Sequence, residues 1–188
     1  MNVYRNIFSA VVILMSSILL ISCNQSSNEQ SGDVNTNQDV NTDQSVPTIA
    51  TNKSGPSVIL SDSDIDILKG DTFSLDITTK DFPASEGGGI SLHFNPALLQ
   101  VAAVDIDGTV WDFTNKDGQI DNTQGIVSDI LFSSYQSVTG DVKIATVEFK
   151  SIEKGMSEIT LEASSNNPFA SDGQNMLVTF TTTNVSSN

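Results

Sequence analysis

The sequence of 188 residues is short of the side chains that build catalytic and metal sites. It has one cysteine, Cys23, and one histidine, His93. A zinc site needs clustered cysteine or histidine ligands, and one of each does not make a cluster. A serine nucleophile would have only His93 as its base, and the G-x-S-x-G signature is absent. We therefore expect no enzymatic activity, and neither a metal nor another cofactor.

Basic residues are also scarce, because the chain has 8 lysines and arginines against 23 aspartates and glutamates. All of the acidic residues but only 7 of the basic ones follow Cys23, so the chain beyond that residue carries a formal charge of −16. Such a surface disfavours nucleic acid and anionic lipid. It favours cationic partners or simple solubility.

Charged residues make up only 16% of the chain and hydrophobic ones 38%, whereas serine, threonine and asparagine are abundant. This composition is typical of an all-β protein outside the cytoplasm. The length suits one domain with appendages.

The first 22 residues have the pattern of a signal peptide. An apolar run of 15 residues, IFSAVVILMSSILLI, follows Arg5 and ends just before Ser22. The run is too short to span a bilayer, which takes about 20 residues. The next residues resemble the lipobox of bacterial lipoproteins, Leu-Ile-Ser-Cys, which implies that Cys23 is lipidated. The resemblance implies anchoring to the bacterial cell envelope, at the outer membrane if the cell is Gram-negative.

The composition changes twice after the apolar run. Residues 23–56 contain almost no large apolar side chains and cannot offset the entropy of ordering, so we expect a disordered linker. From residue 57 to 188, short alternating apolar runs are separated by turn residues, which predicts an antiparallel β-sandwich. The predicted strands are SVIL, DIDIL, TFSLDITTK, GISLHF, LQVAAVDI, TVWDF, GIVSDILF, DVKIATVEFK, SEITLEA and MLVTFTTTNV.

Three stretches of this region resemble a cohesin domain. They are GISLHFNPALLQVAAVDI, GDVKIATVEFKS and SEITLEASSNNPFASDGQNMLVTFTTTNV. The resemblance covers about residues 57–185 and implies a jelly-roll sandwich of about nine strands, related to some carbohydrate-binding modules. Cohesins bind dockerins, which are small calcium-loaded modules, through one flat sheet face.

Alternation along GISLHF puts Ile90, Leu92 and Phe94 on one face of a strand and Ser91 and His93 on the other. The resemblance implies that the second face contacts the partner, together with outward residues of DILF and TVEF. The residues expected to bind a partner are Ser91, His93, Asp129, Leu131, Ser133, Thr146 and Glu148. The chain departs from the family at EGGG, where Gly87 and Gly89 stand at contact positions. These glycines either let a partner backbone approach closely or mark a bulge.

Two acidic motifs are candidates for calcium binding. In NKDGQID, Asn115, Asp117 and Gly118 match an EF-hand loop, but its first and twelfth positions hold no carboxylate, so we favour a hairpin turn. Asp105 and Asp107 of DIDG could bind calcium or act in glycoside hydrolysis. No aromatic-lined cleft is evident nearby in the sequence, so we expect a solvated role.

The sequence thus favours a surface-anchored recognition module that binds a dockerin-like protein. The first alternative is polysaccharide binding, which needs exposed aromatic rings to stack on sugars. It depends on whether Trp111, the only tryptophan, is exposed beside Tyr135. Alternation in TVWDF places Trp111 and Phe113 on one face. The second alternative is a structural envelope lipoprotein without a specific ligand.

Overall fold

The computed structural model describes residues 55–188. The predicted signal peptide, Cys23 and nearly all of the predicted linker lie outside the described residues. Residues 55–188 form thirteen β-strands and no helix, and therefore contain no helix that could cross a membrane. The all-β class predicted from the sequence is confirmed.

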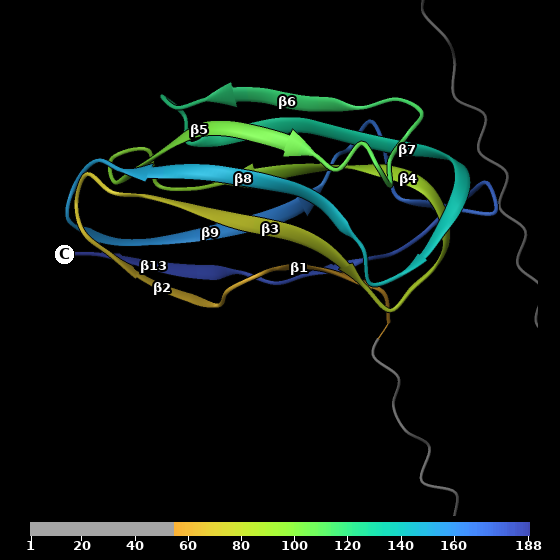
Figure 1. The fold of residues 1–188 in the computed structure, drawn as a ribbon, viewed down its shortest axis with the longest axis horizontal. Helices are drawn as coiled ribbons and strands as arrows, with labels where there is room; N and C mark the ends of the chain where they lie inside the picture. Colours follow the sequence, from red (N-terminus) through yellow and green to blue (C-terminus); the bar gives the residue numbers. More distant parts are fainter. Residues whose placement is uncertain (1–54) are drawn as a thin grey trace, which may run out of the picture. The chain divides into compact units, whose positions relative to one another are not determined.

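The strands form two packed sheets, which are visible in Figure 1. The five-stranded sheet has the order β12 (Thr179–Phe180), β1 (Ser57–Leu60), β3 (Thr72–Lys80), β8 (Lys143–Ser151) and β5 (Leu99–Ile106). The central path of the eight-stranded sheet is β11 (Gln174–Asn175), β10 (Ala170–Ser171), β4 (Phe82–His93), β9 (Gly155–Ala163), β13 (Thr183–Ser187) and β2 (Asp64–Ile67). Strand β7 (Ile126–Gly140) pairs with β4 on the side away from β9, and β6 (Lys116–Asp121) pairs with β7.

The first and last strands cross between the sheets together. Strand β1 runs parallel to β12 in one sheet, and β2 runs parallel to β13 in the other. At the crossing, the Leu60 N–H donates to the Thr181 hydroxyl at 2.9 Å and the Asn184 N–H donates to the Ser63 carbonyl at 2.8 Å. The chain ends of the domain are therefore tied to each other, and both sheets are mixed.

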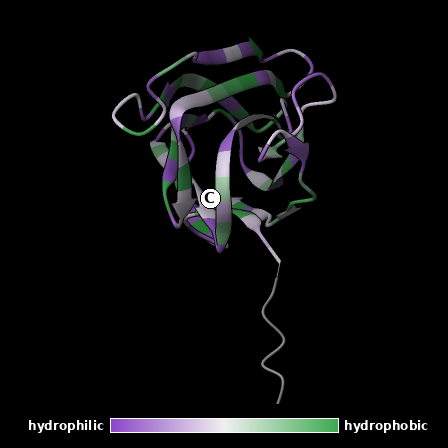
Figure 2. Cartoon of the chain, turned by 90° about the vertical axis from the view of Figure 1, so that its right-hand side faces the viewer, coloured by the Kyte–Doolittle hydropathy of each residue, from purple (hydrophilic) through white to green (hydrophobic). Residues whose placement is uncertain are grey.

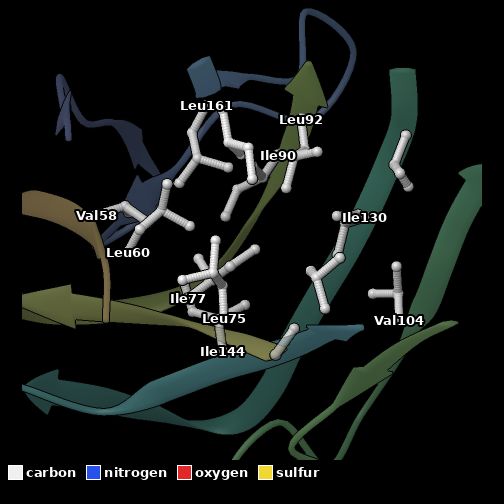
Figure 3. Close-up of a cluster of buried hydrophobic side chains, with 14 of the residues drawn as sticks. Val58, Leu60, Leu75, Ile77, Ile90, Leu92, Val104, Ile130, Ile144 and Leu161 are labelled. Carbon is white, nitrogen blue, oxygen red and sulfur yellow. The ribbon is translucent and has the colours of Figure 1, made fainter. Parts of the chain in front are cut away.

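The hydrophobic core lies between the sheets, as Figure 3 shows for side chains from both of them. Apolar and polar residues alternate along the strands in Figure 2, because successive side chains point to opposite faces. The predicted inward set of GISLHF is confirmed: Ile90, Leu92 and Phe94 are buried. Phe94 packs edge-on against Phe149 of the other sheet, with ring centroids 5.9 Å apart.

Three predicted elements are wrong. MLVTFTTTNV is not one strand, because Thr179–Phe180 form β12 in the five-stranded sheet and Thr183–Ser187 form β13 in the eight-stranded sheet. TVWDF is not a strand, because Thr109 and Val110 belong to a turn and the residues up to Asn115 are irregular. NKDGQID is not a hairpin turn: its residues from Lys116 on form the edge strand β6, in which Gly118 has a φ of 87° and the register with β7 does not shift. The turn lies beyond β6, where Asp121 Oδ1 accepts the Thr123 N–H at 2.9 Å. The dipeptide Asp117-Gly118 is typical of a hairpin turn, but here it lies within β6, which pairs with β7.

Candidate functional site

The candidate site is the outward side of four neighbouring strands of the eight-stranded sheet: β9, β4, β7 and β6. The register aligns their residues in rows. Ile126 of β7 pairs with Asp121 of β6 and with His93 of β4, and His93 pairs with Thr160 of β9. The outward residues, which we call the outer face, are Lys116, Gln119, Asp121, Ile126, Ser128, Asp129, Leu131, Ser133, Ser91, His93, Glu158, Thr160 and Glu162.

His93 and Ser91 both point away from the core, as predicted, but their exposure differs. The His93 side chain is 42% exposed, and its Nε2 lies 3.0 Å from Oε1 of Glu162 on β9. Ser91 is only 8% exposed, because its small side chain lies between Glu162 and a bulge in β7. A partner resting on the outer face would reach the His93–Glu162 pair before it reached Ser91.

The bulge is centred on Asp129. Two residues of β7, Ser128 and Asp129, stand opposite Ser91, and Asp129 takes a left-handed φ of 55°. The Ser164 hydroxyl donates to Asp129 Oδ1 at 2.8 Å. The bulge keeps Asp129 on the outer face while Ile130 stays in the core, so the predicted outward orientation of Asp129 is confirmed.

Leu131 lies at the centre of the outer face, between Gly89 of β4 and Lys116 of β6 in the register. It points outward as predicted but is half-buried, because its side chain lies over the Gly89 backbone. A Cβ placed on Gly89 would lie 2.7 Å from Leu131 Cδ2 and 2.8 Å from the Cβ of Ser164. Ser164, in the segment after β9, therefore covers part of β4.

The glycines of EGGG are required by the packing of the chain itself. At Gly87, φ is +148° and an added Cβ would lie 2.3 Å from the carbonyl oxygen of Phe132. At Gly88, an added Cβ would lie 2.9 Å from the ring of Phe169. The register between β4 and β7 also shifts next to Gly87. Of the two alternatives for these glycines, the structure shows the bulge; the atoms that approach them closely belong to the domain itself and not to a partner.

Ser133 is engaged by the irregular segment before β6. Its Oγ accepts the Thr114 N–H at 3.1 Å, and its hydroxyl donates to the Thr114 carbonyl at 3.0 Å. Ser133 faces outward, as predicted, but its hydrogen bonds hold the loop that leads into β6.

The expected placement of Thr146 and Glu148 on this face is wrong. Both belong to β8, which is in the five-stranded sheet. The Thr146 hydroxyl donates to Asp76 Oδ1 of β3 at 2.6 Å, on the opposite side of the sandwich. Alternation predicts which way a side chain points from its own strand, but it does not say which sheet contains the strand.

Trp111 is fully buried, so it cannot form a sugar platform. Its Nε1–H donates to the Lys143 carbonyl at 2.9 Å, and its ring packs edge-on against Phe132 at a centroid distance of 4.7 Å. The predicted shared face of Trp111 and Phe113 is also wrong, because Phe113 is 57% exposed. The segment between them is irregular and does not follow strand alternation.

The exposed ring of Phe113 packs against a second exposed ring. Tyr135, in the second half of β7, is 73% exposed, and the two ring centroids are 4.5 Å apart at an interplanar angle of 61°. Asp112 fixes this pair: its Oδ1 accepts the Tyr135 N–H at 3.1 Å and the Ser134 hydroxyl at 3.0 Å. These two hydrogen bonds hold the pKa of the Asp112 carboxyl below its ordinary value.

The carboxylates considered for calcium do not form a ligand cluster in the described part of the chain. Asp107 Oδ1 accepts the hydroxyl and the N–H of Thr109 at 2.5 and 3.1 Å, and the hydroxyl contact is the main reason why the pKa of Asp107 is lowered. Asp105 stays exposed on β5. Within residues 55–188, no three acidic, histidine or cysteine side chains are grouped as metal ligands would be.

The chain matches no family model, and no curated protein matches it. Solved structures of cohesins resemble the domain. A non-cellulosomal cohesin from the archaeon Archaeoglobus fulgidus aligns at 13% identity and a TM-score of 0.59, over 72% of this chain and 92% of that chain. The structure of an OlpA cohesin–dockerin complex of type I from Clostridium thermocellum gives 13% identity and a TM-score of 0.59, over 72% and 100%.

A third solved structure contains the third ScaC cohesin of Acetivibrio cellulolyticus in complex with the ScaB dockerin. It aligns at 20% identity and a TM-score of 0.57, over 70% of this chain and 98% of that chain. At these identities the likeness concerns the fold. Residues 55–188 therefore form a domain with the cohesin fold.

Proposed function

We propose that the domain is a non-catalytic recognition module that binds a protein partner through its outer face. The single observation that carries the proposal is the construction of this face on the cohesin fold. Leu131 lies half-buried at its centre, and polar side chains from four strands surround it. Apolar centres inside a polar rim are typical of protein interfaces. The similar cohesins whose structures are named above with dockerins support a dockerin-like partner.

The charges of the outer face favour a basic partner. Four carboxylates lie on it, and Lys116 is the single lysine among its residues. The carboxylates are Asp121, Asp129, Glu158 and Glu162. A partner with lysine or arginine opposite β9 and β7 would be steered towards this face and held in register.

A charge reversal on each sheet tests the proposal. Glu162→Lys changes the outer face beside His93, whereas Glu148→Lys makes the same change on the five-stranded sheet. The full chain and both variants would be titrated by calorimetry with a panel of calcium-loaded dockerin modules. We expect Glu162→Lys to raise the Kd for a bound module about tenfold, because it puts like charges together, and Glu148→Lys to leave the Kd unchanged.

Two outcomes would contradict the proposal. If both reversals raised the Kd equally, the effect would come from total charge and not from the outer face. The second outcome combines two results. No dockerin module binds, and the immobilised wild-type chain and Glu162→Lys capture the same proteins from the cell's envelope and secreted fractions. Protein recognition by this face would then be wrong. The structural lipoprotein role would then remain.

We also propose that the protein is held at the cell envelope by lipid on Cys23. The support is the apolar run of 15 residues that ends two positions before Cys23. Two or three acyl chains on one cysteine would anchor stably, whereas one chain binds only marginally. Cys23→Ser should abolish incorporation of a labelled fatty acid and move the protein from the membrane to the soluble fraction. Unchanged fractionation would contradict the anchor.

A further inference from the structure

We infer that a groove beside the Phe113–Tyr135 pair is a binding site for a neutral polysaccharide chain. The groove encloses about 450 Å³ at the junction of β4, β7 and the segment that follows β9. This volume falls within the usual range of ligand pockets, roughly 300 to 1,000 Å³. The groove shares Leu131 and Ser133 with the outer face, but the inference is carried by other residues and does not depend on the proposed protein partner.

The aromatic pair stands next to the groove. Thr114 lines the groove and directly follows Phe113, and Ser133 lines it two residues before Tyr135 on β7. The edge-to-face packing of the two rings leaves more than half of each residue exposed. The C–H groups of a sugar ring carry a partial positive charge and pack favourably on the electron-rich face of such a ring. Asp112 fixes the pair before any ligand arrives.

The walls of the groove offer hydrogen bonds of the kind that sugar hydroxyls make. Asn166, Asn167 and Asn175 line it. Among residues 55–188, the side-chain hydrogen bonds around the groove involve Ser85, Ser164, Ser171 and Glu86, and none involves these three amides. An amide carries both donors and an acceptor, and a sugar hydroxyl can act as both donor and acceptor. The three amides thus match a hydroxyl-rich ligand.

Glu86 supplies a stronger acceptor. Its Oε1 accepts the Asp172 N–H at 3.1 Å and the Ser137 hydroxyl at 3.4 Å, which fixes the carboxylate at the groove. Its Oε2 is buried and has no hydrogen-bond partner in the described part of the chain. A buried carboxylate oxygen without a donor is costly, and a turn of the Glu86 side chain into the groove would let a ligand hydroxyl supply one.

The charge of the lining selects among polysaccharides. Glu86 is the one charged residue of the lining, and it is negative. The whole chain carries a formal charge of −15. Uronic-acid or sulfated polymers would therefore be repelled, whereas a neutral chain of hexoses or pentoses would not.

The test uses native affinity electrophoresis of the full chain in gels that contain a soluble polysaccharide. The neutral probes are hydroxyethylcellulose, galactomannan and laminarin, and the anionic probe is polygalacturonate. Tyr135→Ala removes a stacking ring, and Glu86→Gln keeps Oε1 but removes the negative acceptor. Leu68→Ala is the matched control, because Leu68 is 62% exposed and lies just after β2, outside the groove.

We expect at least one neutral probe to retard the wild-type chain and polygalacturonate not to retard it. Tyr135→Ala and Glu86→Gln should each raise the apparent Kd about tenfold, and Leu68→Ala should not change it. Because Trp111 is buried, its unchanged fluorescence would show that the variants are folded.

Several results would overturn the inference. They are the absence of retardation by every neutral probe, retardation that both groove variants retain, and stronger retardation by polygalacturonate. If Tyr135→Ala instead weakened a protein partner in the calorimetric titration, with no glycan binding, the groove would be part of the protein interface. Failure of the protein-partner proposal would show in Glu162→Lys and would leave the glycan result unaffected.

Discussion

The outward faces of the two sheets are built differently. On the five-stranded sheet, β8 pairs with β3 and with β5, and the register shifts once in each pairing. Polar side chains there bond across strands, as when Thr146 donates to Asp76 and Lys143 Nζ lies 3.8 Å from the same carboxylate. On the eight-stranded sheet, the register between β4 and β7 alone shifts three times, and three glycines stand in a row.

The difference shows where the sandwich can present a shaped surface. On the five-stranded sheet, where the register shifts less often, the polar side chains of the outward face bond to one another. Bulges and glycines turn side chains aside and let the segment after β9 fold over β4, which leaves hollows of about 450 and 220 Å³ on either side of Leu131. The irregular sheet therefore carries both the proposed interface and the proposed glycan groove.

The largest effect is expected where a side chain ties the two sheets together. Trp111 donates to the start of β8 in one sheet and packs on Phe132 in the other. Trp111→Ala should lower the free energy of unfolding by about 4 kcal/mol, through the cavity and the lost hydrogen bond. Urea denaturation would measure this loss. Phe113→Ala, two residues away and exposed, should cost less than about 1 kcal/mol, and equal losses would contradict the structure.

The second prediction concerns Gly87, the first of the three consecutive glycines on β4. Gly87→Ala should cost about 3 kcal/mol, because the new Cβ meets the Phe132 carbonyl and the residue has a positive φ. Gly140→Ala is the control, since Gly140 also has a positive φ, of 82°, but no atom lies within 4 Å of its added Cβ. Its cost should be about 1 kcal/mol. A similar loss in both variants would mean that Gly87 is not crowded.

The smallest effect concerns the carboxylate that holds the aromatic pair. The pKa of Asp112 is lowered on folding from an ordinary value of 3.8, so its ionised form stabilises the fold above that pH. This contribution is lost as the pH falls through the lowered pKa. The difference in unfolding free energy between wild type and Asp112→Asn should therefore be larger at pH 7 than at pH 2. Ser134→Ala removes one of the two hydrogen bonds to Asp112 and should reduce this pH dependence. An equal difference between wild type and Asp112→Asn at both pH values would contradict the prediction.

Single strands were predictable from the sequence, because alternation is a local property. The buried set of Ile90, Leu92 and Phe94 and the outward direction of His93 and Leu131 follow from it. Loop segments were not predictable in this way. Trp111 and Phe113 differ completely in burial although they are two residues apart, because the segment between them follows a turn and does not alternate.

The sequence by itself determined the all-β class, the inward and outward sides of most strands, and the resemblance to cohesins. These depend on residues near each other in the chain. Only the tertiary structure decided which strands share a sheet, and so it moved Thr146 and Glu148 away from the outer face. It also showed that Gly87 to Gly89 fit against Phe132, Phe169 and Leu131. Contacts between segments many residues apart depend on packing, and no local pattern records them.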